Sequence, residues 1–205
     1  AIACDIKGNI YLTGSYQGTV DFSMVKGLYR RTSRLSSDDI YVLKLDSVGD
    51  FIWAGSMGGT KPDKGKAIDV DHDDNVYILG YFSETADFDP GIAVKNLVSK
   101  GNMDIFLQKF DSDGNLNWVR SVGGSRMDYG QSVNIGPDDE VYVTGVFHDM
   151  ADLDPGAGTF NVTSSGKADF FVAELDSGGA LVWANSYGGL DEDFTHAVTT
   201  DNFGN

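Results

Sequence analysis

The stretch Asn-Ile-Tyr-Leu-Thr-Gly at residues 9–14 decides the fold, because the chain repeats it twice. The copies read Asn-Val-Tyr-Ile-Leu-Gly at 75–80 and Glu-Val-Tyr-Val-Thr-Gly at 140–145. A second stretch, Asp-Ile-Tyr-Val-Leu-Lys-Leu-Asp at 39–46, has its own copies at 104–111 and 169–176. Repetition at a fixed, long period indicates an architecture in which successive copies bury a shared core.

Further landmarks keep the same spacing. Each copy has one tryptophan followed by one glycine pair: Trp53, Trp118, Trp183, Gly58-Gly59, Gly123-Gly124 and Gly188-Gly189. The period is 65 residues, with one extra residue early in the first copy. We therefore divide the chain into repeats at 1–66, 67–131 and 132–196, and we expect residues 197–205 to begin a further one.

Each copy alternates strand signals with turn signals. In the first copy, 10–16, 39–46 and 51–57 are predicted strands, and a weaker fourth run lies at 28–35, 94–98 and 160–164 in the three copies. The pattern predicts an all-β fold, a β-propeller fragment of three four-stranded blades of about 65 residues plus the start of a fourth. A β-helix has much shorter repeats, and a helical solenoid has helical periodicity, which is missing here.

Three blades do not close a ring, because propellers use about four to eight. Two blade faces would stay open and invite association. We therefore expect other blades of a longer protein, or other copies of this chain, to cover them.

The repeated aromatic and glycine positions have structural interpretations. We expect the tryptophans to lie in the core between blades, with Trp118 buried and its indole nitrogen bonded to a neighbour. The glycine pairs are expected to close the last strand with a tight turn. The one cysteine, Cys4, lies in the apolar run Ala-Ile-Ala-Cys and is expected to be a small core residue.

Composition excludes several classes of protein. Fifteen basic residues face 31 acidic ones, for a net charge of −16, so the positive footprint that nucleic acid requires is missing. No apolar run approaches the ~18 residues of a membrane span. A single cysteine excludes an internal disulfide and a cysteine-based zinc site.

The repeats resemble the SBBP-type β-propeller repeat, found in seven-bladed propellers of bacterial secreted and surface proteins. The matching residues are 8–14, 39–46, the Trp53 strand and Gly58-Gly59, together with their later copies. The segment Ala-Asp-Phe-Asp-Pro-Gly at 86–91 and its copy at 151–156 resemble the variant of Bacteroidetes surface proteins. The resemblance implies export to the cell surface or the extracellular space and a non-catalytic role in scaffolding or adhesion.

The Asp-x-Asp-Pro-Gly loops are the candidate metal site. Asp87 and Asp89 in one loop, and Asp152 and Asp154 in the next, place alternate carboxylates on one side of an extended segment. Together with turn carbonyls they offer the oxygen ligands that Ca²⁺ prefers, although two carboxylates fall short of six to eight ligands. The alternative is that each Asp bonds turn amides while the residue between them plugs the core. Ser23 replaces the second Asp in the first copy, so no calcium site is expected at Asp21.

Other polar residues indicate no catalysis and no further cofactor. His72, His148 and His196 lack partners at metal or triad spacing and are expected to be surface residues. The acidic runs 69–75 and 111–115 echo the start of an EF-hand but lack its last ligand, so we expect turns there.

The sequence favours a non-enzymatic propeller module that serves as a scaffold or interaction platform, with protein or glycan ligands bound at loops or in the central channel. One alternative is a carbohydrate-binding propeller that uses Tyr81, Phe82 and Phe147 as exposed aromatics. Another is part of an enzyme whose active site lies in further blades.

Overall fold

The computed structural model describes residues 1–23, 25, 27–201 and 204. The predicted all-β class is confirmed: the sheets are antiparallel, and the described residues contain one helical turn, Arg34–Ser36. No helix in these ranges is long and apolar enough to cross a membrane.

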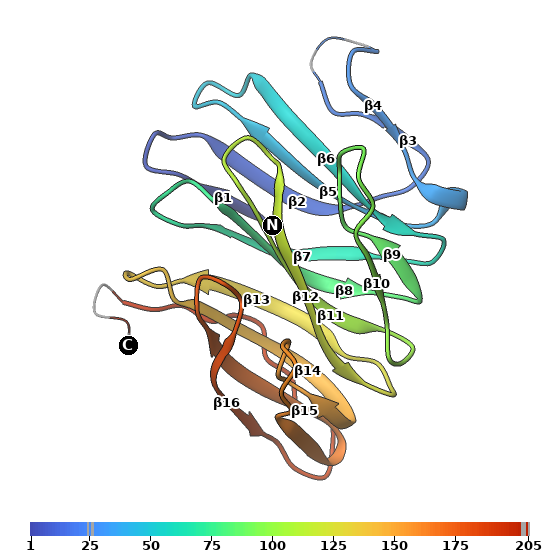
Figure 1. The fold of residues 1–205 in the computed structure, drawn as a ribbon, viewed down its shortest axis with the longest axis vertical. Helices are drawn as coiled ribbons and strands as arrows, with labels where there is room; N and C mark the ends of the chain where they lie inside the picture. The colour runs from blue at the N-terminus through green and yellow to red at the C-terminus, as the bar shows by residue number, and fades with distance from the viewer. Residues whose placement is uncertain (24, 26, 202–203, 205) are drawn as a thin grey trace.

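Three four-stranded antiparallel meanders follow one another along the chain and lie side by side (Figure 1). Unit 1 contains β1 (Ile2–Cys4), β2 (Ile10–Tyr16), β5 (Asp39–Leu45) and β6 (Phe51–Gly59). Unit 2 contains β7 (Lys64–Val70), β8 (Val76–Phe82), β11 (Asp104–Phe110) and β12 (Leu116–Gly124). Unit 3 contains β13 (Tyr129–Ile135), β14 (Val141–Asp152), β15 (Asn161–Leu175) and β16 (Leu181–Tyr187).

The fourth strand of each unit is not the weak run expected at 28–35, 94–98 or 160–164. Those runs contribute to an outer hairpin in the long connection between the second and third strands of each unit. We call this connection the excursion. This hairpin is β3 (Thr19–Asp21) with β4 (Arg30–Thr32), then β9 (Thr85–Asp87) with β10 (Asn96–Val98), and in unit 3 the far ends of β14 and β15. The strand that completes each meander is the first one: β1, β7 or β13.

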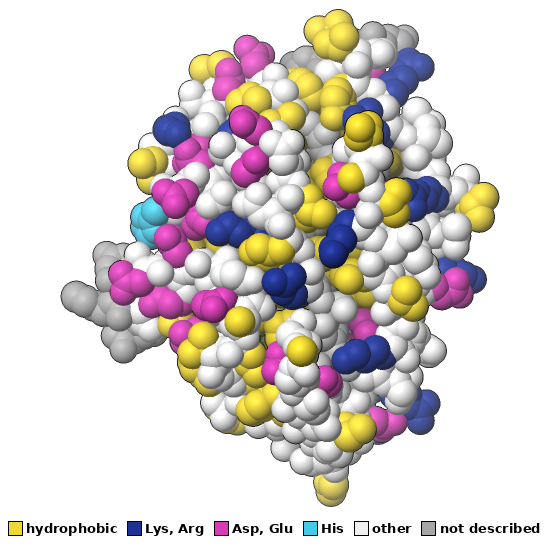
Figure 2. Space-filling view, viewed as in Figure 1, with side chains coloured by type: hydrophobic (Ala, Val, Ile, Leu, Met, Phe, Trp, Pro, Cys, Tyr) yellow, Lys and Arg dark blue, Asp and Glu magenta, His cyan; other side chains and the backbone are white. Residues whose placement is uncertain are grey.

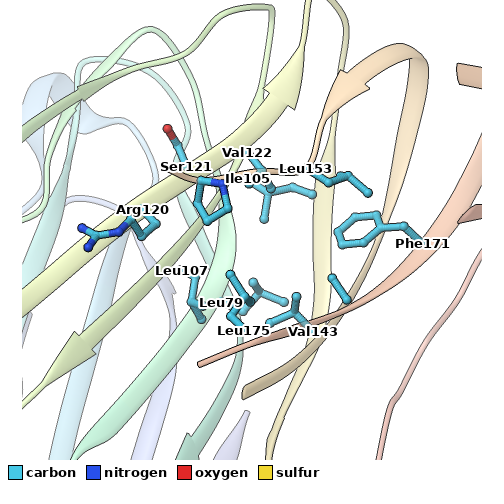
Figure 3. A pocket seen from close by; sticks show the side chains of 12 residues that line it. Leu79, Ile105, Leu107, Arg120, Ser121, Val122, Val143, Leu153, Phe171 and Leu175 are labelled. Atoms are coloured by element: carbon cyan, nitrogen blue, oxygen red, sulfur yellow. The ribbon is translucent and has the colours of Figure 1, made fainter. Parts of the chain in front are cut away.

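Apolar side chains fill the space between successive units. Ile40 and Met57 of unit 1 belong to one buried cluster with Ile78 and Phe106 of unit 2. A second cluster joins units 2 and 3, and Figure 3 shows side chains of unit 2 (Leu79, Ile105 and Leu107) and of unit 3 (Val143, Phe171 and Leu175) around a small apolar pocket. Each unit therefore depends on its neighbour for a complete core.

The repeat boundaries were placed from the 65-residue sequence period alone, and this division of the chain stays a prediction. Strand β7 begins at Lys64, so the boundary at 66/67 falls inside a strand. At the expected fourth repeat, Thr200 donates from its amide and hydroxyl to Asn134 Oδ1 at 2.9 and 2.8 Å. The equivalent bond one period earlier runs from the Ile135 amide to Asp69 Oδ2 at 2.7 Å. Residues 202, 203 and 205 of that expected repeat lie outside the described residues.

The expectation for Cys4 is wrong: its side chain is exposed. It lies on β1, which pairs with β2 on one side only. Local hydrophobicity alone did not reveal which residues of this run face a neighbour.

Candidate functional site

The Asp-x-Asp-Pro-Gly loops join each unit to the one before it. Gly58 and Gly59, the last residues of β6, pair with Asp87 and Ala86 at the start of the loop in unit 2. One period later, Gly123 and Gly124 pair in the same way with Asp152 and Ala151 of unit 3. Gly58-Gly59 and Gly123-Gly124 are therefore strand residues that receive the next unit's loop, and the expectation of a tight turn is wrong for these two pairs.

We call each contact between a glycine pair and the loop of the next unit a joint. Close approach of the two backbones explains why glycine is needed there. A Cβ built on Gly124 would overlap the Met150 carbonyl oxygen, and one on Gly59 would overlap the carbonyl oxygen of Thr85. No side chain fits between the strands at these positions.

The first Asp of each loop closes it by accepting backbone amides. Asp87 Oδ1 accepts the amides of Asp89 at 3.2 Å and Lys95 at 2.8 Å. Asp152 Oδ1 does the same with the residues two and eight positions later, Asp154 at 3.1 Å and Phe160 at 2.9 Å. Asp21, in the copy that lacks the second Asp, makes the matching bonds to Ser23 and Tyr29 at 3.2 and 3.3 Å.

The second Asp makes a smaller turn. Asp89 Oδ1 accepts the Gly91 amide at 2.7 Å, and Asp154 Oδ1 accepts the Gly156 amide at 2.7 Å. These are the bonds expected when an Asp stabilises a turn through its own side chain.

The apolar residue between the two carboxylates plugs the core. Phe88 is fully buried, with its ring centroid 5.3 Å from that of Phe82 and 4.9 Å from that of Phe106. Leu153 is buried at the same place in unit 3. The loop is thus a structural joint whatever else it binds.

A cation from the preceding unit faces each first carboxylate. Arg34 of unit 1 lies 3.2 Å from Asp87 Oδ2, and Lys100 of unit 2 lies 3.6 Å from Asp152 Oδ2. Asp21, which no earlier unit faces in the described chain, is 3.8 Å from Arg30 of its own hairpin.

The calcium interpretation stays a prediction. The structure places Asp87 with Asp89, and Asp152 with Asp154, in two equivalent loops, but turn amides already contact all four carboxylates and side-chain cations contact Asp87 and Asp152. Among the described residues, no group of three or more His, Cys, Asp or Glu side chains is arranged to hold a metal ion. A cation there would need carbonyl and water oxygens to complete its ligands.

Sequence reasoning missed a pair of buried carboxyl groups beneath the first joint. Asp39 and Asp63 are 2% and 0% exposed, and a Cβ built on Gly58 would lie 3.2 Å from Asp39 Oδ1 and 3.1 Å from Asp63 Oδ2. Burial raises the pKa of Asp39 to about 6 and that of Asp63 to about 7, because loss of hydration disfavours the charged form of each carboxyl. Among the described residues, Asp39 Oδ1 has no hydrogen-bond partner.

Unit 2 repeats this carboxyl pair. Asp104 and Asp128 are both fully buried on either side of Gly123. Burial raises the pKa of Asp128 to about 6 and also raises the pKa of Asp104. The available signal was the recurrence of an Asp four residues after each glycine pair: Asp63, Asp128 and Asp193.

Each tryptophan of the first two units covers a glycine in the next unit. Trp53 Nε1 donates to the Ser112 carbonyl at 3.1 Å, and its ring packs on Gly114, which has φ +84. Trp118 donates to the Ser177 carbonyl at 3.3 Å and packs on Gly179. The predicted indole bond of Trp118 is confirmed, but its ring is half-buried and not fully buried as expected.

The remaining expectations divide between surface and core. His72 and His196 are exposed and His148 is half-buried, and the acidic runs at 69–75 and 111–115 form the expected turns, closed by amide bonds to Asp71 and Asp111. Phe82 and Phe147, expected as exposed sugar-binding aromatics, are fully buried. Tyr81 packs edge-on against Tyr129.

Large apolar side chains are exposed on the excursions between the second and third strands of the units. Their exposed fractions include 83% at Leu35, 108% at Ile92, 68% at Val94 and 55% at Met150. In Figure 2, basic and apolar side chains are interspersed across the centre and right of the view, and acidic ones gather toward the left.

Two known proteins resemble the chain. The uncharacterized WD repeat-containing protein L264 of Acanthamoeba polyphaga mimivirus is 26% identical over 114 residues, covering 49% of this chain and 8% of that protein. The regulatory protein FlaEY of Caulobacter vibrioides is 29% identical over 150 residues, covering 73% of this chain and 15% of that protein. No family model matches the chain. These similarities fit a β-rich repeat protein, and they do not establish membership of the SBBP family.

Proposed function

We propose that the chain is part of a β-propeller in a non-enzymatic protein of the cell surface or extracellular space, and that it presents its loops to a protein partner. Units 1, 2 and 3 are then three blades, and residues 197–201 begin a fourth. Four-stranded antiparallel units with the same contacts at each joint support this architecture, as does the likeness to a WD repeat-containing protein.

The observation that carries the binding role is the exposed apolar surface of the excursions. Ile92, Val94 and Val98 of unit 2 are 108%, 68% and 66% exposed on a loop whose base is fixed by the buried Phe88. A rigid base with apolar tips is typical of a protein-binding loop. Carbohydrate binding has less support, because two of the three aromatics expected for it are in the core.

A displayed library of random peptides, panned on the purified chain, tests this role. We expect enriched peptides whose binding is lost in the triple variant Ile92→Ser, Val94→Ser, Val98→Ser. The matched control is Ile6→Ser with Val48→Ser, because these exposed apolar residues lie in turns between other strands. Equal binding by both variants would refute the loop platform, and selective binding on a glycan array would favour the carbohydrate alternative.

A further inference from the structure

Strand β10 is the last strand of a sheet that runs through two units. The strand order is β1-β2-β5-β6-β9-β10, so the outer hairpin of unit 2 extends the four strands of unit 1. Within the described residues β10 pairs with β9 alone, and its other side is a free edge. Unit 2 has a neighbour on each side, so this edge stays open even though both joints of the chain are formed.

The ladder between β9 and β10 determines which backbone groups of β10 are free. Residues of an antiparallel pair alternate between those that exchange hydrogen bonds with the partner strand and those that do not. On the β9 side of the hairpin, the Lys95 carbonyl accepts a backbone amide at 2.9 Å and the Ser99 amide donates to a backbone carbonyl at 2.8 Å. Leu97, midway between them, is therefore the residue of β10 that bonds to β9. The N–H and C=O groups of Asn96 and Val98 point to the open side.

The fold holds this edge in an extended form. Leu97 turns inward and packs against the buried cluster that contains Phe88. Asn96 and Val98 are exposed, Val98 by 66%. An anchored strand with unpaired backbone groups is a template for another extended chain, and its order reduces the entropy that binding costs.

Charge indicates which extended chain fits. The segments 26–35, 92–101 and 157–166 occupy the same place in the three copies, and they contain four, two and no basic residues and no acidic residue, in a chain with 31 acidic and 15 basic residues. In unit 2 the two bases, Lys95 and Lys100, flank β10 and are exposed. Like charges oppose the pairing of two such edges from two copies of the chain, and they favour a strand of opposite charge.

We propose that β10 accepts an extended acidic peptide segment of a partner protein as an added strand, bonded through the backbone groups of Asn96 and Val98. The segment continues the six-stranded sheet by one strand and places its acidic residues near Lys95 and Lys100. The inference rests on the proposed protein-binding role of the excursions, and it specifies the chemistry of the partner and how that partner binds.

A nuclear magnetic resonance titration of the isotope-labelled chain tests the strand addition. The probe is a capped synthetic peptide, Glu-Val-Thr-Val-Thr-Val-Glu, whose acidic ends flank residues that favour strands. We expect saturable binding with the largest amide shifts at Asn96 and Val98. Shifts of the Asn96 and Leu97 amides then give Kd for this edge alone, whatever binds at the equivalent edges of the other copies.

Two substitutions at one position separate backbone bonding from side-chain contact. Val98→Pro is expected to raise Kd about 10-fold, because proline removes the outward N–H and leaves a peptide carbonyl without its donor. The bonds of Leu97 to β9 are unaffected, since proline is tolerated in edge strands where the N–H faces outward. Val98→Thr is the matched control, which keeps the N–H and is expected to change Kd less than about 3-fold.

Changing the peptide makes the test independent of how the variants fold. Methylation of single peptide amides is expected to weaken binding about 10-fold at every second position and to leave the positions between them unchanged, because a strand bonds to its neighbour through alternate residues. The peptide Lys-Val-Thr-Val-Thr-Val-Lys is expected to bind about 10-fold more weakly than the acidic one, with a difference that shrinks as salt is added.

Three results would overturn the inference: no shifts at β10 with up to about 1 mM peptide, methylation losses without a period of two, or equal binding of the acidic and basic peptides. Broadening of the Asn96 and Val98 amides with rising protein concentration, without peptide, would assign the edge to a second copy and also overturn it.

The proposed function is judged by a different variant. The triple serine variant at positions 92, 94 and 98 keeps every backbone amide of β10. Library peptides that are lost in that variant, but bind Val98→Pro unchanged, would leave a side-chain platform standing without strand addition.

Discussion

The buried pair Asp39 and Asp63 predicts that stability falls as pH rises, in a way that one substitution removes. Both pKa values are raised by burial, to about 6 and about 7, from ordinary values near 3.8. The unfolded chain therefore releases these protons at lower pH than the folded chain. The contribution of the two carboxyls to the free energy of unfolding is therefore fully favourable below about pH 4, and it is lost as the pH rises through their folded-state pKa values of about 6 and about 7.

Asp39→Asn is the perturbation that fits this geometry. Its amide oxygen can still accept the Arg34 amide, which Asp39 Oδ2 accepts at 3.1 Å. Its NH₂ group then stands where Asp39 Oδ1 has no partner, beside Asp63. The Asp39 pKa is raised by about 2 units, and at ~1.36 kcal/mol per unit the variant should gain up to about 3 kcal/mol over the wild type between low and high pH.

Urea unfolding from pH 5 to pH 8 measures this difference, with the lower limit kept above the sequence pI of about 4.3. We expect the free energy of unfolding of Asp39→Asn, relative to wild type, to rise by about 1–1.5 kcal/mol across that range, because only the part of the contribution between pH 5 and the raised pKa of about 6 remains to be lost. Asp111→Asn is the matched control, because hydrogen bonds from Asn115 outweigh burial and lower the pKa of Asp111, so its effect should not change across this pH range. A pH-independent difference for Asp39→Asn would refute the reasoning.

Three further predictions concern the joints. Gly124→Ala is expected to lower the free energy of unfolding by about 2–3 kcal/mol, because the new methyl overlaps the Met150 carbonyl oxygen; a similar loss for Gly178→Ala, in an exposed turn, would contradict this. Phe88→Ala is expected to cost about 3–5 kcal/mol in urea unfolding and the half-buried Phe22→Ala less, whereas equal losses would mean that Phe88 is not a plug. Because amides and cations already contact Asp87 and Asp152, we expect a chelator to leave Tm unchanged; calorimetric heat with Ca²⁺ that disappears in Asp89→Asn plus Asp154→Asn would instead establish a calcium site.

The regular strands were predictable because their own residues alternate. The strand expected at 10–16 is the observed β2. Its buried residues, Tyr11, Thr13 and Tyr16, are separated by less buried ones. Strand β7 was missed because it contains Lys64, Gly65 and Asp69. Asp69 is needed there, since it accepts the Ile135 amide of the next unit at 2.7 Å. A strand whose polar residues bond to a neighbouring unit gives no apolar alternation to detect.

The candidate site was predictable only as far as bonding stays local. The Asx turns of Asp87 and Asp152 follow from the loop sequence, because the amides they accept lie two and eight residues away. The carboxyl pair was not predictable in the same way. Asp39 and Asp63 are 24 residues apart in the sequence, and each resembles an ordinary acidic turn residue until the fold brings both to Gly58.

Comparison of the three copies within the chain separates residues that maintain the packing between units from residues that are exposed and available to bind a partner. Three features recur in every copy: the tryptophan, the glycine pair and the Asp that begins the repeated runs 39–46, 104–111 and 169–176. In units 1 and 2 all three lie at a joint, so their recurrence is explained by packing and needs no ligand. Apolar side chains that do not recur in every copy, including those of Leu35, Ile92 and Met150, are exposed on the excursions. The proposed binding role therefore fits these loops best, since changes there leave the joints intact.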